Sequence, residues 1–516
     1  MKPLDVIVVG GGIAGMAYAA ALIDSARNRP LRIRVLSKAP VAGSSSHAAQ
    51  GGVAAAMGAN DSFELHAADT MMVGAGRNDP DMVELVVREG PSVIHWLERM
   101  GAVFDKDATG RLEMAREGGH SVARVVHHRD RTGGEIVRAL RMHLRNAREV
   151  ELIEGQHVLD LVVEDSPLGR ACTGVRAIEY ASGDLLECRS DLVILATGGA
   201  GQVYEHTTNP IEATGDGIAM ALRAGVALRD MAFVQFHPTA LYTGERGQTP
   251  LISEAVRGAG ARLLRHDGRH LMSGLHPAGD LAPRNVVARA ILTEMRSTGV
   301  PYALLDASPI GSTYFAQLFP AIERECRSHG LAPGHDLLPV MPAAHYLCGG
   351  IAIDDRGRTS LSGLMALGEC AGSGLHGADR LASNSLLEAL VLPQRTALAS
   401  WAFAPKNAAP RLPGVVRSKL SRQKPATALR AQAAIRHAMS THLGLLRNRD
   451  GMEAALRVVA HCERVIAPMW MRRRWSLELI NLRDLSAVAR AIIEGALNET
   501  TSIGTHHLEA RQTVAA

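Results

Sequence analysis

The six cysteines of this 516-residue chain form no CxxC pair and are scattered along the sequence. Neither a zinc site of closely spaced cysteines nor the disulfide framework of a small secreted protein is therefore indicated. A reducing compartment fits this usage, so we expect a cytoplasmic protein with no metal site. The cysteines are Cys172, Cys188, Cys326, Cys348, Cys370 and Cys462.

An excess of charge of one sign is also missing. The chain has 56 Lys and Arg residues against 52 Asp and Glu residues, a formal net charge of only +4. No large field is present to attract a nucleic acid or a membrane surface, and we expect neither as a partner. With 47% hydrophobic residues, the chain is long enough to bury several cores, so two to four domains are expected.

One uncharged run, VIVVGGGIAGMAYAAALI at residues 6–23, approaches the length of a membrane span. The run contains four glycines, follows a single lysine and has no clear cleavage site, so neither a membrane span nor a signal peptide fits it well. We interpret it as a buried strand at residues 6–9, a tight turn, and a helix over residues 16–26.

The turn carries the pattern Gly10-x-Gly12-x-x-Gly15, which is weak alone but gains weight between a strand and a helix. The first glycine permits the sharp turn, the second lets a pyrophosphate approach the backbone, and the third lets helix and strand pack closely. The second strand, at residues 31–37, ends at Ser37-Lys38, where a ribose-binding acid is usual. A hydroxyl and a cation still suit a dinucleotide, and NADP stays open at this point.

Three further segments have the character of a strand, a small-residue turn and a helix. They are DLVILATGG at residues 191–199, ATGDGIAMALRAG at 213–225 and GLMALGECAGSGLHGADRLASNSLLEAL at 363–390. Each alone is more simply a structural unit without a ligand. Because they lie far apart in the chain, together they indicate one domain interrupted by another.

Nine motifs occur in a fixed order along residues 1 to about 400: GGGIAG, AQGG, REGGHS, ATGG, GDGIAMA, QFHPTALY, APRNVVARAI, PAAHYLCGG and GECAGSGLHGADRLASNSLLE. This order resembles the succinate dehydrogenase/fumarate reductase flavoprotein family, and within it the L-aspartate oxidase branch. The resemblance implies an α/β fold with a Rossmann-like FAD-binding domain interrupted by an α+β capping domain. It places the FAD-binding domain at residues 1–225 and 340–400 and the capping domain at 226–339.

The resemblance also implies that residues 44–52, SSSHAAQGG, wrap the flavin, because small side chains let backbone N–H groups reach it. Relatives that attach FAD covalently have a histidine five residues before the matching glutamine, where this chain has Ser45. His47 lies only three residues before Gln50, so we expect non-covalent FAD, with a shifted attachment site as the alternative. The residues assigned to FAD are Gly10, Gly12, Ile13, Ala14, Gly15, Lys38, Ser44, Ser45, Ser46, His47, Ala48, Ala49, Gln50, Gly51, Gly52, Asp216, Glu369, Asn384, Ser385 and Leu386.

At the substrate end, Arg284 falls in the first turn of a helix predicted to start at a proline. A cation is unfavourable at that end of the helix dipole, and such a local conflict is typical of a functional residue, although a surface arginine bonded elsewhere explains it too. A dicarboxylate that leaves water needs several fixed donors. By family position these are Arg284, at the proton-transfer position, with His237, Ser253, His345 and Arg380; isolated histidines of this kind are more often core residues.

Glu117, in AREGGHS, is the residue that distinguishes L-aspartate from succinate and fumarate as the expected substrate. A buried carboxylate would repel succinate or fumarate but can pair with the ammonium group of L-aspartate. The resemblance then implies hydride transfer from Cα to flavin and loss of an amine proton, giving iminoaspartate. Oxygen, forming hydrogen peroxide, or fumarate would reoxidise the flavin, and the product would pass to quinolinate synthase in NAD biosynthesis. The alternatives are a fumarate reductase or succinate dehydrogenase flavoprotein subunit and a non-catalytic flavin-binding paralogue.

Beyond residue 400 the match is looser. Residues 402–414 are rich in Pro and Ala and predict a linker, and the helical spacing of apolar residues after it predicts a C-terminal three-helix bundle within residues 415–516. His461 and Cys462 are expected to be packing residues of this bundle. The tail keeps Gly504 and His506 but has Thr501 and Ile503 where relatives carry an acid and an arginine, so its contacts with the rest of the molecule are left open. Asp379 replaces the asparagine of many relatives, beside Arg380.

Overall fold

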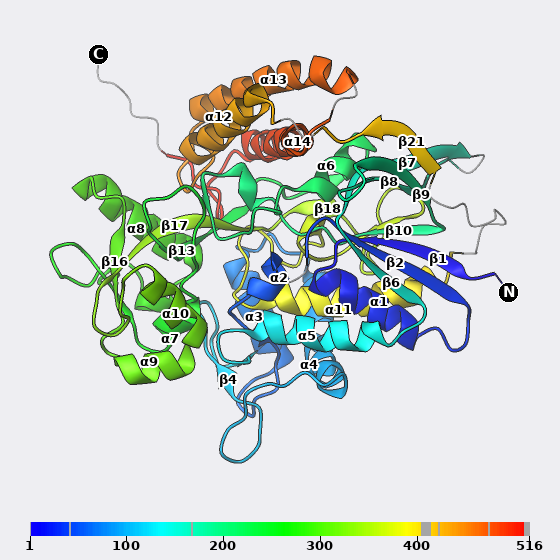
Figure 1. Cartoon of the computed structure of the whole chain (residues 1–516). Helices are drawn as coiled ribbons and strands as arrows, with labels where there is room; N and C mark the ends of the chain where they lie inside the picture. The colour runs from blue at the N-terminus through cyan, green and yellow to red at the C-terminus, as the bar shows by residue number, and fades with distance from the viewer. Residues whose placement is uncertain are drawn as a thin grey trace.

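The computed structural model describes residues 2–40, 43–166, 169–403, 414–421, 424–472 and 475–509. Its central sheet has five parallel strands in the order β19-β10-β1-β2-β6, so segments far apart in the chain lie side by side (Figure 1). This order confirms the expectation of one nucleotide-binding fold interrupted by another part of the chain. The strands are β1 (Leu4–Val9), β2 (Leu31–Ser37), β6 (Val150–Glu154), β10 (Leu192–Leu195) and β19 (Leu364–Ala366).

Helices α1, α5 and α11 cover one face of this sheet, with α1 packed against both of the others. A four-stranded antiparallel sheet, β21-β9-β8-β7, lies against the opposite face. The elements of these layers are α1 (Ile13–Asp24), α3 (Phe63–Val73), α4 (Pro80–Arg99), α5 (Thr132–Arg145), α6 (Asp216–Arg223), α11 (Asn384–Ser400), β7 (Gln156–Ser166), β8 (Gly169–Glu179), β9 (Asp184–Arg189) and β21 (Gly414–Lys419).

The first helix begins at Ile13, three residues earlier than predicted, because the extended backbone of Gly12 serves directly as its N-cap. Gly10 has φ +116°, and a Cβ there would lie 2.1 Å from the carbonyl oxygen of Ala196 on the neighbouring strand end. A Cβ at Gly15 would lie 2.1 Å from the carbonyl oxygen of Gly10. The turn-forming role of the first glycine and the packing role of the third are thus confirmed.

The cap has a second sheet and its own hydrophobic core, which includes Leu263, Leu305 and Phe315 (green in Figure 1). The expected border between the cap, ending at residue 339, and the second FAD-binding segment, beginning at residue 340, falls inside strand β17. The exact limits of the two domains therefore stay predictions. Its elements are β11 (His206–Thr207), β13 (Val234–Leu241), β14 (Gly247–Gln248), β15 (Arg262–Leu264), β16 (Ala303–Asp306), β17 (Leu338–Leu347), α7 (Glu254–Gly258), α8 (Arg284–Thr298), α9 (Ser312–Leu318) and α10 (Pro320–Ser328).

Short elements complete the walls of the site. Residues 45–48 form a helical turn, α2, where a loop was expected, because Ser44 caps it by accepting the backbone N–H of His47 at 3.2 Å. The short elements are α2 (Ser45–Ala48), β3 (Val53–Ala54), β4 (Met114–Ala115), β5 (Val125–Val126), β12 (Leu228–Arg229), β18 (Gly350–Ala352) and β20 (Ala371–Gly372).

Three C-terminal helices, α12 (Ala426–His442), α13 (Arg449–Met471) and α14 (Leu477–Asn498), pack against one another, which confirms the predicted bundle. Helix α14 also contacts α6 of the nucleotide-binding part. Cys462 is buried in the bundle, as expected for a packing residue. His461, the residue before it on α13, is exposed to solvent, so the expectation that it packs in the bundle is wrong. The predicted linker at 402–414 lies almost entirely outside the described residues.

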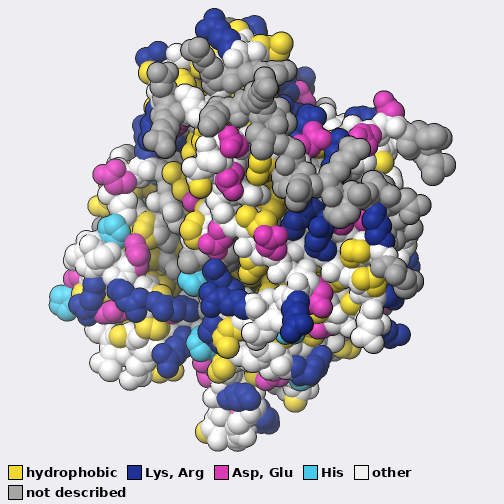
Figure 2. Space-filling model, turned by 45° about the vertical axis from the view of Figure 1, so that its right-hand side comes forward, with side chains coloured by type: hydrophobic (Ala, Val, Ile, Leu, Met, Phe, Trp, Pro, Cys, Tyr) yellow, Lys and Arg dark blue, Asp and Glu magenta, His cyan; other side chains and the backbone are white. Residues whose placement is uncertain are grey.

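The surface mixes both signs of charge, and Figure 2 shows Lys and Arg side chains among Asp and Glu side chains over the visible face. All six cysteines are buried, and none of them forms a disulfide within the described residues. None of the helices in the described part of the chain is long and apolar enough to cross a membrane. The uncharged run at residues 6–23 is a strand and a helix, as predicted.

Candidate functional site

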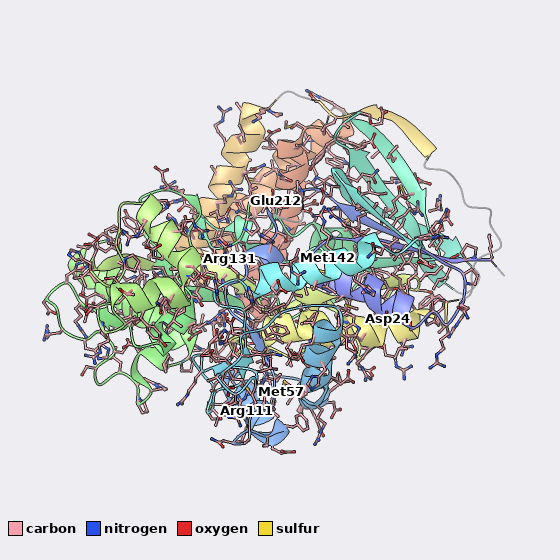
Figure 3. The ribbon with its side chains drawn as sticks, turned by 60° about the horizontal axis from the view of Figure 1, so that its bottom comes forward. Asp24, Met57, Arg111, Arg131, Met142 and Glu212 are labelled. Atoms are coloured by element: carbon pink, nitrogen blue, oxygen red, sulfur yellow. The ribbon has the colours of Figure 1, made fainter. Side chains whose placement is uncertain are left out.

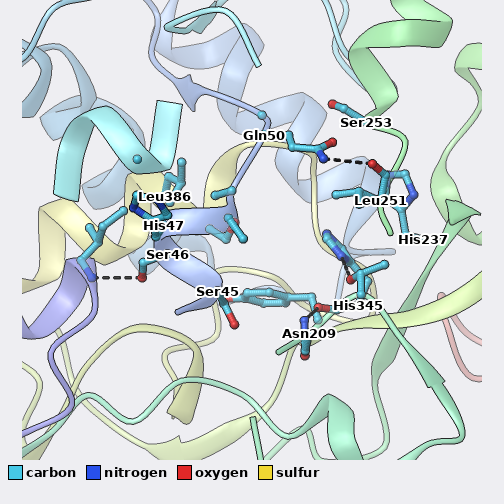
Figure 4. A pocket seen from close by; sticks show the side chains of 18 of the residues that line it. Ser45, Ser46, His47, Gln50, Asn209, His237, Leu251, Ser253, His345 and Leu386 are labelled. Carbon is cyan, nitrogen blue, oxygen red and sulfur yellow. Dashed lines mark hydrogen bonds between the residues drawn. The ribbon is translucent and has the colours of Figure 1, made fainter. Parts of the chain in front are cut away.

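A cavity of about 1240 Å³ extends from the N-terminus of α1 to strands β13 and β17 of the cap. A second cavity of about 130 Å³ adjoins it and shares the walls at Gly12, Ser45, Ser46, Ala196 and Gly198. In Figure 4, Ser46, His47 and Leu386 lie on one side of the large cavity, and Gln50, Ser253, His237 and His345 lie on the other. The hollow is therefore elongated, with a nucleotide-binding end and a polar end under the cap.

Nearly all residues assigned to FAD line these two cavities. The two that do not are Gly15, which acts through the packing of α1 on β1, and Asn384, whose amide bonds to His66 and Thr70. Those that do are Gly10, Gly12, Ile13, Ala14, Lys38, Ser44, Ser45, Ser46, His47, Ala48, Ala49, Gln50, Gly51, Gly52, Asp216, Glu369, Ser385 and Leu386.

The helical turn α2 is tied to the start of α1. The Oγ atom of Ser46 accepts the backbone N–H of Ile13, the first residue of α1, at 3.0 Å (Figure 4). His47 is exposed to solvent on this turn, and Ser45, at the position of the covalent histidine in some relatives, lines both cavities. The positive end of the α1 dipole thus faces the space between the two cavities, which suits a pyrophosphate.

The smaller cavity holds a cation and an anion in contact. The Nζ atom of Lys38 lies 2.6 Å from Asp216 Oδ2 and 2.7 Å from Thr214 Oγ1. Burial raises the pKa of the Asp216 carboxyl, but the attraction of Lys38 and the contact with His157 outweigh it and hold the pKa well below its usual range. An ionised acceptor beside a cation can hold the hydroxyls and phosphates of a dinucleotide.

Among the described residues, His157, Asp216 and Asp484 form one group whose ligand atoms all lie within 4.8 Å. Both carboxylates already have cationic partners, because Lys38 pairs with Asp216 and Arg223 pairs with Asp484 at 2.6 Å. These pairs neutralise the charge that a metal ion would need, so the group functions as an ion-pair network between the cofactor cavity and α14.

The flavin end offers acceptors to a ligand. Gln50 donates from Nε2 to the carbonyl oxygen of Leu251 at 2.9 Å, while its buried Oε1 has no hydrogen-bond partner among the described residues. Burial raises the pKa of Glu369 to about 7, and a Cβ at Gly199 would lie 2.1 Å from its Oε1. The unpaired buried oxygen of Gln50 fits FAD, because it awaits a donor such as an N–H group of the ligand. The glycine backbone along the wall fits as well, because it lets backbone N–H groups approach acceptors of the ligand.

All six residues assigned to the substrate line the polar end of the large cavity: Glu117, His237, Ser253, Arg284, His345 and Arg380. Arg284 is the first residue of α8, as predicted, and donates from Nε to Glu254 Oε2 at 2.7 Å and from Nη1 to Gln235 Oε1 at 3.0 Å. The carboxylate of Glu254 compensates for a cation at the wrong end of a helix dipole.

Arg380 points into the same space from the loop before α11. Its Nε and Nη2 donate to Gln235 Oε1 at 3.3 and 3.1 Å, its Nη1 donates to Ser385 Oγ at 2.7 Å, and the guanidinium lies 4.6 Å above the ring centroid of Tyr346. Burial and the nearby Arg284 lower its pKa to about 10, so the side chain is still cationic at neutral pH. One neutral oxygen, that of Gln235, thus holds both guanidinium groups.

The two histidines lie with ring centroids 5.0 Å apart. Burial and the neighbouring arginines lower both pKa values well below the usual range, so both rings are neutral. The Nδ1 atom of His237 accepts the backbone N–H of Thr239 at 3.3 Å, which leaves the ring proton on Nε2, and His345 Nδ1 lies 2.6 Å from Thr208 Oγ1. His237 therefore presents a donor, as a carboxylate-binding site requires.

Glu117 lines the same cavity as these donors. The side chain is only 3% exposed, and its Oε2 accepts the hydroxyl of Ser383 at 2.6 Å. Burial and the nearby Glu254 raise its pKa, against the opposing effect of Ser383, Arg284 and Arg380. A buried carboxylate in the same cavity as two arginines gives the cavity both signs of charge.

Sequence reasoning missed Gln235, Glu254 and Ser383, which hold the arginines and Glu117 in place. Gln235 had a signal, because it is a polar residue inside a strand whose eight residues are all buried. Glu254 had a weaker one, since it precedes Arg257 by one helical turn, and their side chains meet at 3.2 Å.

Comparison with known proteins defines the class. A family described as an FAD binding domain matches residues 5–386, so the fold and the cavity are those of an FAD-binding flavoprotein. Among solved structures, Escherichia coli quinol fumarate reductase FrdA has a TM-score of 0.88 at 28% identity, covering 99% of this chain and 92% of that one. Mycobacterium smegmatis Sdh1 has a TM-score of 0.80 at 30% identity, covering 98% and 89%.

Closer sequence relatives narrow the class. An L-aspartate oxidase from Streptomyces coelicolor is 40% identical over 98% of this chain and 88% of the relative, and L-aspartate oxidase 1 from Ralstonia nicotianae is 39% identical over 97% and 94%. An L-aspartate oxidase from Mycobacterium tuberculosis is 41% identical over 98% and 92%. The chain belongs to the L-aspartate oxidase family.

Proposed function

We propose that this protein oxidises L-aspartate to iminoaspartate with bound FAD. The observation that carries the proposal is the position of Glu117, a buried carboxylate that lines the same cavity as two cationic arginines and two neutral histidines. This arrangement suits a ligand with two carboxylates and one ammonium group. A dicarboxylate without the ammonium would leave Glu117 buried and unpaired with a cation, which is costly.

The donors divide between the carboxylates and the amine. Arg284, Arg380, His237, His345 and Ser253 supply N–H and O–H groups for two carboxylates, and charge-assisted hydrogen bonds of this kind offset the cost of removing them from water. Glu117 pairs with the ammonium, and its raised pKa makes it a stronger base that can accept a proton from nitrogen. The substrate is thereby fixed with Cα in a single orientation.

Bound FAD supplies the acceptor for the hydride that leaves Cα. When fumarate serves as the electron acceptor, its reduction to succinate also requires a proton. We assign Arg284 as the catalytic residue that donates this proton. Its hydrogen bond to Glu254, and the ion pair of Glu254 with Arg257 at 3.2 Å, form a chain that can replace the proton. An arginine is a weak acid and base, so its role depends on this neighbouring carboxylate.

We further propose that FAD is held without a covalent bond. Ser45 has no nucleophilic nitrogen, and His47, the histidine nearest to it in the sequence, is exposed on α2. Precipitation of the holoenzyme with acid should release all of the flavin into the supernatant. Flavin that stays with the pellet, and is lost in His47→Ala, would instead establish a shifted attachment site.

The two oxidants are separable by experiment. With oxygen, each L-aspartate should give one hydrogen peroxide and one iminoaspartate; without oxygen, added fumarate should give one succinate for each L-aspartate consumed. Iminoaspartate is short-lived in water, and its use by quinolinate synthase in NAD biosynthesis is part of the proposal. Purified protein that turns over L-aspartate with either oxidant supports the function, and failure with both would contradict it.

A further inference from the structure

The chain after α14 forms a segment, residues 499–509, that we call the C-terminal strap (red in Figure 1). It reaches the loop that carries Arg380. The backbone N–H and the Oγ1 of Thr505 both donate to the carbonyl oxygen of Ala378, each at 3.0 Å. Thr505 is 2% exposed, so these hydrogen bonds are shielded from water, two residues from a guanidinium of the substrate end.

The strap fits this loop closely. Gly504 has φ +53°, and a Cβ there would lie 2.4 Å from the carbonyl oxygen of Ala378, so the approach requires glycine. The next residue of the loop, Asp379, is fully buried and accepts Nε2 of Gln235 at 2.6 Å. The loop at 378–380 is therefore held on one side by the strap and on the other by Gln235, which also contacts both arginines.

The strap is anchored independently on the helical bundle. Arg447, between α12 and α13, is fully buried; its Nη1 donates to the carbonyl oxygen of Ala232 at 2.7 Å and lies 3.1 Å from His506 Nδ1. The backbone of Arg447 also pairs with that of the strap at His507 and Glu509. These contacts answer the question that the altered tail raised: Gly504 and His506 still fix the tail, without an acid at 501 or an arginine at 503.

We propose that the C-terminal strap positions Arg380 for substrate binding and that Thr505 is the positioning residue through which it acts. A guanidinium held in place before the ligand arrives loses less entropy on binding a carboxylate. The inference rests on the proposed function, since it requires Arg380 to bind a substrate carboxylate. The effect should thus appear in the affinity for dicarboxylates and not in the content of FAD.

The test compares variants of the FAD-loaded full chain. Thr505→Val keeps the shape but removes one donor, Thr505→Ser keeps the donor, and Thr501→Val is the matched control at an exposed position of the same strap. Succinate is the binding probe, followed by the change in flavin absorbance, and L-aspartate gives KM and kcat. Loss of one buried hydrogen bond predicts a roughly threefold to tenfold rise in KM and in the Kd of succinate for Thr505→Val.

We expect unchanged kcat and flavin content for Thr505→Val, and wild-type behaviour for Thr505→Ser and Thr501→Val. Unchanged binding in Thr505→Val would overturn the proposal, as would equal losses in kcat, flavin content and affinity, which indicate a merely structural role. If Thr505→Val does not fold, the comparison of Thr505→Ser with Thr505→Ala decides, because only the second lacks the hydroxyl.

A further variant separates this inference from the proposed function. Arg380→Lys loses the planar fork that reaches Gln235 and Ser385, so succinate binding should weaken more than in Thr505→Val. Weak binding in Arg380→Lys with normal binding in Thr505→Val would remove only the role of the strap. Normal binding in Arg380→Lys would remove the role of Arg380 in the proposed function itself.

Discussion

Asp379 is the residue at which the substrate end departs most clearly from a simple cationic clamp. It is fully buried beside Arg380, and burial raises its pKa from 3.8 to about 6, although the hydrogen bond from Gln235 opposes this shift. The folded protein thus retains a proton on Asp379 that the unfolded chain releases between about pH 4 and pH 6. The free energy of unfolding must therefore fall as the pH rises through this range.

Asp379→Asn should abolish this dependence, because an asparagine can still accept the Gln235 hydrogen bond but does not titrate. A shift of two pKa units corresponds to about 3 kcal/mol, so the variant should be more stable than the parent by up to that amount above pH 6. The measurement is urea unfolding of both proteins at about pH 4.5 and pH 8. A stability difference that is the same at both pH values would contradict the assignment.

At this scale, the sequence predicted the residues that line the cavity better than those that support them. Arg284 stands out because a cation in the first turn of a helix conflicts with the helix dipole, whereas His237 and Arg380 were assigned by family position. Ser383, which bonds to Glu117, lies 266 residues away along the chain, and no local pattern relates two such positions. Contacts of this range depend on the fold as a whole.

In the turn between β1 and α1, Gly12 and Gly15 have different roles. A Cβ at Gly15 would meet the rigid backbone of Gly10 at 2.1 Å, whereas a Cβ at Gly12 would meet only the side-chain oxygen of Ser46, at 2.9 Å. Gly15→Ala should therefore force α1 away from β1 and destabilise the whole nucleotide-binding part. Gly12→Ala should leave the apoprotein folded and weaken FAD binding, since Gly12 lines both cavities.

Thermal unfolding of the two apoproteins and titration with FAD separate these effects. Gly15→Ala is expected to cost about 3 kcal/mol or more of stability, as overpacking against backbone does, and Gly12→Ala is expected to cost little. FAD affinity should fall about tenfold or more in Gly12→Ala. Equal losses of stability in both variants would show that the glycines share one role.

Elements of this size were predicted well where the hydrophobic pattern is strong, as in β1, β2 and the bundle. The turn α2 was predicted as a loop, because four residues carry no helical period and only the Ser44 cap reveals it. The start of α1 was placed three residues late for a related reason: a glycine-rich stretch looks unlike a helix, although here it forms the first turn.

For the whole molecule, one of the contacts between the nucleotide-binding part and the cap involves Asp130, which lines the large cavity together with Ala321. Asp130, next to the start of α5, accepts the backbone N–H groups of Ala321 and Ile322 at 2.7 and 3.0 Å, at the N-terminus of α10. Figure 3 shows Arg131, the neighbouring residue, between α5 and the green elements of the cap. A carboxylate at a helix N-terminus is well placed to hold the cap closed.

Asp130→Ala should favour the open cap. Loss of two buried hydrogen bonds to a charged acceptor, at roughly 1.5–3 kcal/mol each, predicts a higher KM for L-aspartate and faster quenching of flavin fluorescence by iodide. Asp306→Asn is the matched control, because the acid of Asp306 caps a turn within the cap alone. Identical iodide quenching in Asp130→Ala and the parent protein would remove Asp130 from cap closure.

We propose that Glu117 selects an amino acid over a plain dicarboxylate. The direct measurement is anaerobic mixing of the FAD-loaded protein with L-aspartate and, separately, with succinate, while the loss of flavin absorbance is followed in the parent protein and in Glu117→Gln. We expect that only L-aspartate bleaches the flavin and that Glu117→Gln needs at least about tenfold more L-aspartate to do so. Equal bleaching by succinate, or no effect of Glu117→Gln, would contradict it.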